Sequence, residues 1–155
     1  MVRIELTLVI ECPAEKVFAA LTDLEHLSEW QSSVISSKSA GPLAVGTRIR
    51  EQRTLMGREH HNELEVTAYD PPRRFALVGC SGPVPLSVDH ELVEDGGKTI
   101  VQVHAQAKPG SLFKLAEPMI TRAAQQELRS DFARLKASLE RDDFRQPPRS
   151  QPRSD

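Results

Sequence analysis

The sequence predicts an α+β domain in which a curved antiparallel sheet packs around one long C-terminal helix. Residues 2–10 alternate between apolar and polar side chains, which is typical of a half-buried strand. Further alternating segments separated by short turns follow up to residue 107, as in an antiparallel meander. A single apolar stripe at helical spacing then runs through residues 124–139. A curved sheet wraps one helix only by leaving a gap, so this order of elements also predicts a ligand cavity.

Two short helices are predicted directly after the first strand. Pro13 ends that strand, because proline lacks a backbone donor, and it suits the first turn of a helix. Residues 14–21 carry apolar side chains at helical spacing. Thr22 and Asp23 form a capping sequence for a second helix at residues 24–30.

The sequence predicts a series of strands in the central part of the chain. The pattern is weak in the first of them, residues 33–39. Glycine and proline separate the segments, and the turn at residues 94–97 has the composition of a tight hairpin. The predicted strands are residues 33–39, 47–55, 60–69, 75–80, 86–93 and 99–107.

The long helix is expected to start at Gly110 and Ser111. Pro118 lies inside this segment, so we expect a kink or a new helix start there. We expect one folded domain over residues 1–141. Residues 142–155 contain one apolar residue and three prolines, which predicts a disordered polar tail.

Composition is that of an ordinary globular chain. The 155 residues suit one domain, with 39% hydrophobic and 27% charged residues. A net charge of -2 and a pI near 6.2 predict no general attraction to nucleic acid. No apolar run is long enough for stable membrane insertion, and the N-terminus lacks a signal-peptide pattern, so we expect a cytoplasmic protein. The composition suits a monomer or a homodimer.

Six short motifs together carry a family resemblance. They are residues 12–23 (CPAEKVFAALTD), Trp30, 45–48 (VGTR), 69–75 (YDPPRRF), 97–99 (GKT) and 135–140 (LKASLE). In this order and spacing they resemble the START-like superfamily (SRPBCC), in particular its polyketide cyclase/dehydrase and lipid-transport branch. The resemblance covers about residues 2–140. It implies the helix-grip fold, a seven-stranded antiparallel sheet curled around the C-terminal helix with the two short helices closing one end.

The resemblance implies a range of functions rather than one. Members of this superfamily include aromatase/cyclases, ligand carriers, steroid binders and quinone-binding proteins. The motifs define the fold, and they transfer no catalytic residue to this chain. Function must therefore be argued from the site.

Strand parity identifies candidate site residues. Side chains alternate across a strand, so the apolar residues Ile49, Leu64 and Val88 mark the inner face of three strands. Polar residues on the same parity are Glu51, Arg53, His60, Asn62 and His90. We predict that they line the cavity and orient the polar end of a hydrophobic small molecule. The alternative is that they sit at solvated strand ends.

Trp30 completes the predicted ligand-binding set. It ends the second short helix, where it is placed to cover the cavity mouth, although core packing explains it equally well. Glu51 and Arg53 can partly compensate each other's charge on one strand.

Catalysis is the second hypothesis. Histidine is a common general base near neutral pH, so His60 or His90 is the candidate base that a cyclase or dehydratase would need. Glu51, His60 and His90 would make a two-histidine, one-carboxylate metal site, but nothing in their spacing requires one. The chain lacks HExxH and GxGxxG motifs and a complete P-loop or GxSxG motif, and we expect no cofactor.

Overall fold

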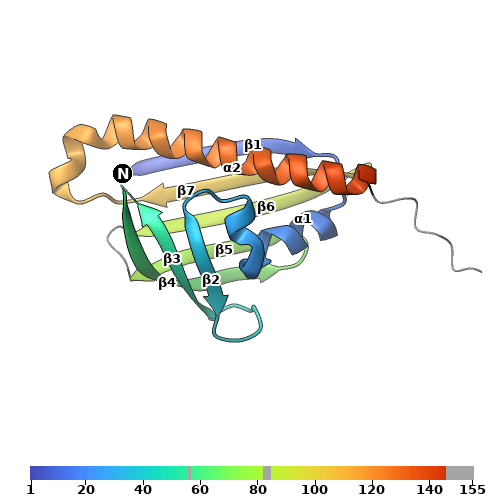
Figure 1. Ribbon diagram of the computed structural model, residues 1–155, viewed down its shortest axis with the longest axis horizontal. Coiled ribbons are helices and arrows are strands. Elements are labelled where there is room, and N and C mark those ends of the chain that lie inside the picture. The colour runs from blue at the N-terminus through green and yellow to red at the C-terminus, as the bar shows by residue number, and fades with distance from the viewer. Residues whose placement is uncertain (56, 82–84, 146–155) are drawn as a thin grey trace, which may run out of the picture.

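A seven-stranded antiparallel sheet and one long helix make up most of the structure (Figure 1). The computed structural model describes residues 1–55, 57–81 and 85–145. The strands are β1 (Val2–Ile10), β2 (Val34–Ser39), β3 (Arg48–Leu55), β4 (Arg58–Asp70), β5 (Arg74–Ser81), β6 (Leu86–Asp95) and β7 (Lys98–Ala107). The helices are α1 (Ala14–Leu21), η1 (Leu24–Glu29), η2 (Ser111–Ala116) and α2 (Glu117–Arg145). This is the predicted helix-grip architecture, which is confirmed.

The strand order is β1-β7-β6-β5-β4-β3-β2, so the first and last strands of the chain pair with each other. All neighbours are antiparallel, as a meander requires. The predicted hairpin between β6 and β7 is present. Gly96 and Gly97 both adopt positive φ there, at 61° and 81°, which only glycine tolerates without strain.

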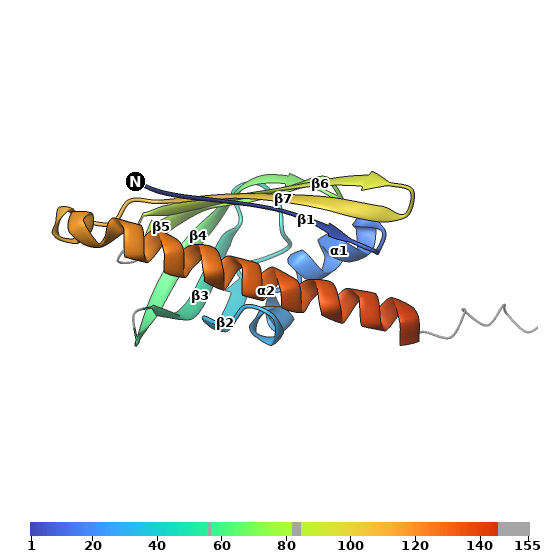
Figure 2. The ribbon, with the colours of Figure 1, turned by 90° about the horizontal axis from the view of Figure 1, so that it is seen from above.

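The sheet is strongly curved. Strands β1, β6 and β7 run alongside α2, whereas β2 and β3 cross its direction at a steep angle (Figures 1 and 2). Helix α2 lies along β1 and covers that edge of the sheet. Gln125 and Lys136 donate to the carbonyls of Glu5 (3.0 Å) and Val9 (2.6 Å), so polar groups of the edge strand are satisfied by the helix.

A series of contacting rings forms the centre of the core and joins the sheet to α1 and α2. We call it the ring chain, and its members are Tyr69, Phe18, Phe75, His90, Phe132 and Trp30. Phe75 and His90 stack on adjacent strands, and Phe132 of α2 lies between His90 and Trp30. The ring pairs and centroid distances are Phe18–Tyr69 (5.7 Å), Phe18–Phe75 (6.3 Å), Phe75–His90 (6.0 Å), His90–Phe132 (6.1 Å) and Trp30–Phe132 (5.1 Å). The domain therefore closes on aromatic contacts at the end where α1 and η1 lie.

A new helix starts beside Pro118, which is one of the two outcomes expected there. Residues 111–116 form a separate 3-10 helix, and α2 starts at Glu117, so Pro118 lies in its first turn, where a missing N–H costs nothing. Helix α2 continues to Arg145, four residues into the segment for which the sequence predicts a polar tail. No glycine or proline occurs there before Pro147, so nothing in the sequence interrupts the helix. The rest of the predicted tail, residues 146–155, lies outside the described residues.

Candidate functional site

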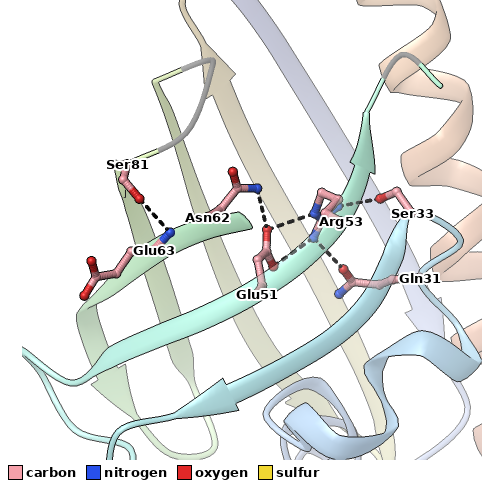
Figure 3. A network of polar contacts seen from close by, with 7 residues as sticks. All are labelled: Gln31, Ser33, Glu51, Arg53, Asn62, Glu63 and Ser81. Carbon is pink, nitrogen blue, oxygen red and sulfur yellow. Dashed lines mark hydrogen bonds and ion pairs between the residues drawn. The ribbon is translucent and has the colours of Figure 1, made fainter. Parts of the chain in front are cut away.

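A group of polar side chains lies on the inner face of the sheet where β2, β3 and β4 run side by side (Figure 3). Glu51 pairs across the ladder with Asn62 on one side and Ser37 on the other, so all three side chains share one face. Arg53, one step further along β3, pairs with His60. We call Ser37, Glu51 and Asn62 the polar row.

Arg53 and Glu51 form a two-pronged ion pair within this group. Arg53 Nε donates to Glu51 Oε1 at 2.9 Å, and Arg53 Nη2 donates to Oε2 at 3.3 Å. The same guanidinium donates from Nη1 to Ser33 Oγ (2.6 Å) and from Nη2 to Gln31 Oε1 (3.2 Å). All three guanidinium nitrogens therefore already donate within the chain. The Glu51 side chain is only 4% exposed, and this pairing is what makes its burial tolerable.

Two oxygens of the polar row have no such partner. Asn62 Nδ2 donates to Glu51 Oε1 at 3.4 Å, which directs Asn62 Oδ1 away from the carboxylate. Asn62 Oδ1 and Ser37 Oγ are buried and have no hydrogen-bond partner among the described residues. A buried polar atom left in this state costs about 1–3 kcal/mol. The row thus holds unused hydrogen-bonding capacity.

His90 occupies a different environment, on β6 among the rings of the core. Its Nδ1 lies 2.9 Å from the Phe75 carbonyl oxygen, which can only accept, so Nδ1 carries the proton and donates. Burial lowers the pKa of His90, although the Phe75 carbonyl and the charge of Asp89 act in the opposite direction. The ring is therefore neutral near pH 7. Its other nitrogen, Nε2, has no partner in the part of the chain that the structure describes.

The structure divides the predicted site residues into two places. Glu51, Arg53 and Asn62 are hydrogen-bonded together, and His60 lies beside them, half-buried and opposite Arg53. His90 and Trp30 belong instead to the ring chain around Phe132, and Trp30 is 6% exposed. The six predicted residues therefore lie in two groups, one around the Glu51–Arg53 ion pair and one around Phe132.

Three polar residues at this site are not predicted from the sequence: Gln31, Ser33 and Ser37. Gln31 and Ser33 lie in and beside the turn that leads into β2, where no alternation applies. Ser37 is hidden by a register shift between Val34 and Ser36, which restores an inward side chain at an unexpected position. The one available signal was that serine recurs in an otherwise weak strand.

Several apolar side chains on the inner face of the sheet and on α2 remain partly accessible. Six of them lie on the inner face of the sheet or on α2 and are half-buried, although the helix spans this face. They are Leu6, Leu8, Leu77, Leu86, Val88 and Leu128. A close-packed interior would bury such side chains completely.

A separate hollow of about 580 Å³ lies away from this face, between the start of α1, the β4–β5 turn and the end of β6. Glu94 closes part of it by accepting from the Ala14 N–H at 2.7 Å. The hollow contains neither the polar row nor the ring chain.

Among the described residues, no group of three or more histidine, cysteine or acidic side chains is placed to hold a metal ion. No helix in the described part of the chain has the length and apolarity to cross a bilayer.

The curved seven-stranded sheet and the long C-terminal helix define the class of START-like helix-grip domains. The chain belongs to the polyketide cyclase/dehydrase and lipid transport family, whose model matches residues 1–140. No curated protein sequence matches it.

Solved structures share this fold at low sequence identity. TTHA0849 from Thermus thermophilus is 18% identical with a TM-score of 0.78, covering 90% of this chain and 98% of its own. A START superfamily protein from Mycobacterium smegmatis is 16% identical with a TM-score of 0.74, covering 91% and 99%. The Zhui aromatase/cyclase from Streptomyces sp. R1128 is 14% identical with a TM-score of 0.74, covering 90% and 93%. These likenesses show the fold.

Proposed function

We propose that this protein binds a hydrophobic or amphipathic small molecule between the inner face of the sheet and helix α2. The observation that carries the proposal is the set of half-buried apolar side chains on that face, from Leu6 to Leu128. Apolar surface that stays accessible inside a domain favours binding of an apolar ligand. Membership of a family described by polyketide cyclisation and lipid transport supports a ligand of this kind.

The polar row, together with Arg53 beside Glu51, supplies the second element of such a site. An apolar surface holds most of a ligand, and a few fixed polar groups set its orientation. Glu51, Arg53 and Asn62 are held by their mutual hydrogen bonds rather than by solvent. They are therefore pre-organised to meet the polar end of a ligand whose apolar part contacts Leu86 and Val88.

A fluorescence titration with N-phenyl-1-naphthylamine tests this proposal. Emission of this apolar probe should rise saturably with one site per chain. Val88→Trp fills the inner face and should abolish saturable binding. Gln106→Trp adds the same side chain on the exposed outer face of β7 and should bind as the wild type does. No saturable binding by the folded wild type, or equal binding by both variants, contradicts the proposal.

A second candidate is a cyclase or dehydratase, and the state of His90 is the observation that favours it. A neutral imidazole with its proton fixed on Nδ1 leaves Nε2 as a base. Such a base would remove a proton from a carbon between two ketones, so that the resulting enolate attacks a further carbonyl of the same chain. The neighbouring aromatase/cyclase structure supports this candidate at the level of fold.

The catalytic candidate is tested with a linear poly-β-ketone substrate and mass spectrometry of the products. His90→Gln should abolish the cyclised product, whereas His61→Gln, on the exposed face of β4, should form it at the wild-type rate. Wild-type product from the double variant His60→Gln/His90→Gln would exclude both histidines as the base.

A further inference from the structure

We propose that the polar row selects a ligand whose polar end is a neutral hydrogen-bond donor, an alcohol or phenol hydroxyl, and that Asn62 Oδ1 and Ser37 Oγ receive it. This inference rests on the proposed function and specifies the ligand class. It contradicts the simplest expectation for a site that contains an arginine, which is the binding of an acid.

The hydrogen bonds of Arg53 argue against an acidic ligand. Its Nε, Nη1 and Nη2 atoms donate to Glu51, Ser33 and Gln31, and the partner carboxylate cancels its charge at 2.9 Å. These bonds use four of the five guanidinium N–H groups. A ligand carboxylate that displaced Glu51 would leave that buried side chain without its countercharge. The positive charge of Arg53 is therefore already matched within the chain.

The orientation of Asn62 makes its free atom an acceptor. Its Nδ2 faces Glu51 Oε1 at 3.4 Å, and the opposite orientation would place two oxygens against each other. Oδ1 is the atom left over, buried and without a partner among the described residues. An amide oxygen accepts and cannot donate, so it requires a donor.

Ser37 repeats the arrangement on the other side of Glu51. The ladder register places Ser37 and Asn62 on either flank of that carboxylate, on one face of three adjacent strands. Ser37 Oγ is the second buried oxygen with no hydrogen-bond partner in the described chain. A hydroxyl both donates and accepts, so it can complete a chain of hydrogen bonds that starts at a ligand hydroxyl.

Both residues remain partly accessible to a ligand. Asn62 and Ser37 are half-buried as residues although these two oxygens are covered. The terminal torsion of an asparagine side chain is soft, so a small rotation brings Oδ1 to an incoming hydroxyl. The hydroxyl then satisfies an atom that otherwise stays unpaired, whereas an ether or ketone of the same shape does not.

Three naphthalenes of matched size test the inference through competition with N-phenyl-1-naphthylamine at pH 7. They are 2-naphthol, 2-methoxynaphthalene and 2-naphthoate, which present a donor, an acceptor and an anion. We expect 2-naphthol to bind about 5–10-fold more tightly than the ether, the effect of one neutral hydrogen bond. We expect 2-naphthoate to bind more weakly than both.

Variants assign the preference to the polar row. Asn62→Leu should bring the ratio of naphthol to ether affinity to about one, while affinity for the ether stays within about twofold of the wild type, because only the polar contact is lost. Ser37→Ala should reduce the ratio. Ser36→Ala, the neighbour on the outer face of β2, should leave it unchanged.

Failure of this inference is distinct from failure of the proposed function. Probe binding with 2-naphthoate the tightest competitor, or with equal affinities for all three, would overturn the donor preference and leave the binding function standing. A preference for 2-naphthol that survives both Asn62→Leu and Ser37→Ala would place the hydroxyl elsewhere. Absence of probe binding would overturn both proposals.

Discussion

The carboxylate of Glu51 and the guanidinium of Arg53 lie side by side on β3, joined by hydrogen bonds of 2.9 and 3.3 Å. Residues two apart on a strand share a face, so the pair is built by one strand alone and needs no distant partner. Neighbouring turns and strands then supply Gln31, Ser33 and Asn62 to complete it. The network therefore forms within the folded chain and does not depend on a bound ligand.

Removing one member of this pair should be costly. Arg53→Met leaves the buried Glu51 carboxylate unpaired, and we expect a loss of about 3 kcal/mol in unfolding free energy, measured by urea denaturation. Arg48→Met makes the same substitution at an exposed ion pair on the outer face of β3 and should cost less than about 1 kcal/mol. The double variant Glu51→Leu/Arg53→Met should recover most of the loss. Equal losses from the two single variants would contradict this account.

Asp131 should be the main polar anchor of α2. It is 6% exposed, accepts from the Ser32 N–H at 3.1 Å and pairs with Arg134, which in turn donates to the Trp30 carbonyl at 3.1 Å. Asp131→Ala leaves the Ser32 N–H without its partner, and we expect a loss of about 2–3 kcal/mol. Glu127→Ala removes an exposed contact one turn earlier on the same helix and should cost under about 0.5 kcal/mol. Similar midpoints for the two variants in thermal unfolding would argue against the anchor.

Phe132 should hold Trp30 in its buried position. The two rings are 5.1 Å apart, and Phe132 is 2% exposed. Phe132→Ala should cost about 3–5 kcal/mol and shift the fluorescence of Trp30, the only tryptophan, to longer wavelength. Leu128→Ala shortens a half-buried side chain on the same helix and should leave the emission unchanged. Unchanged emission in Phe132→Ala would show that another group shields Trp30.

The buried neutral His90 predicts a specific loss of stability in acid. Below about pH 6.5 the unfolded chain binds a proton at this histidine and the folded chain does not, because burial lowers the folded pKa. The contribution of neutral His90 to the free energy of unfolding is therefore fully present above that pH. As the pH falls, this contribution is lost at up to about 1.4 kcal/mol per pH unit, until the pH reaches the pKa of His90 in the folded protein.

Urea denaturation between pH 5 and pH 8 measures this dependence. The slope below pH 6.5 should become shallower in His90→Phe than in the wild type, whatever the overall stability of the variant. His104→Gln, on the exposed outer face of β7, serves as the matched control for the removal of a histidine. An unchanged slope in His90→Phe would mean that folding does not lower the pKa of His90.

Most of the fold follows from local patterns. Alternation over residues 2–10 predicts β1 with its observed bounds, and the stripe through Phe132 and Leu135 predicts the buried side of α2. Parity also places Glu51 and Asn62 on one face, because the apolar markers Ile49 and Leu64 are themselves ladder partners. Alternation is a local property, and these strands obey it without interruption.

The features that could not be predicted from the sequence depend on register shifts in the strand pairing and on tertiary packing. A register shift near Val34 brings Ser37 inward, and another between Val66 and Ala68 lets Tyr69 contact Phe75. Neither shift has a signature in the local sequence. Parity points His90 inward, but its place between Phe75 and Phe132 depends on how α2 is docked.

Native mass spectrometry of the purified protein, before and after organic extraction, tests the central claim most directly. The account predicts a chain that carries an additional small-molecule mass, which extraction removes and which 2-naphthol restores at one molecule per chain. Val88→Trp should show only the mass of the bare chain. A folded wild type that shows the bare mass throughout, including after incubation with 2-naphthol, would contradict the claim that this helix-grip domain binds a ligand inside.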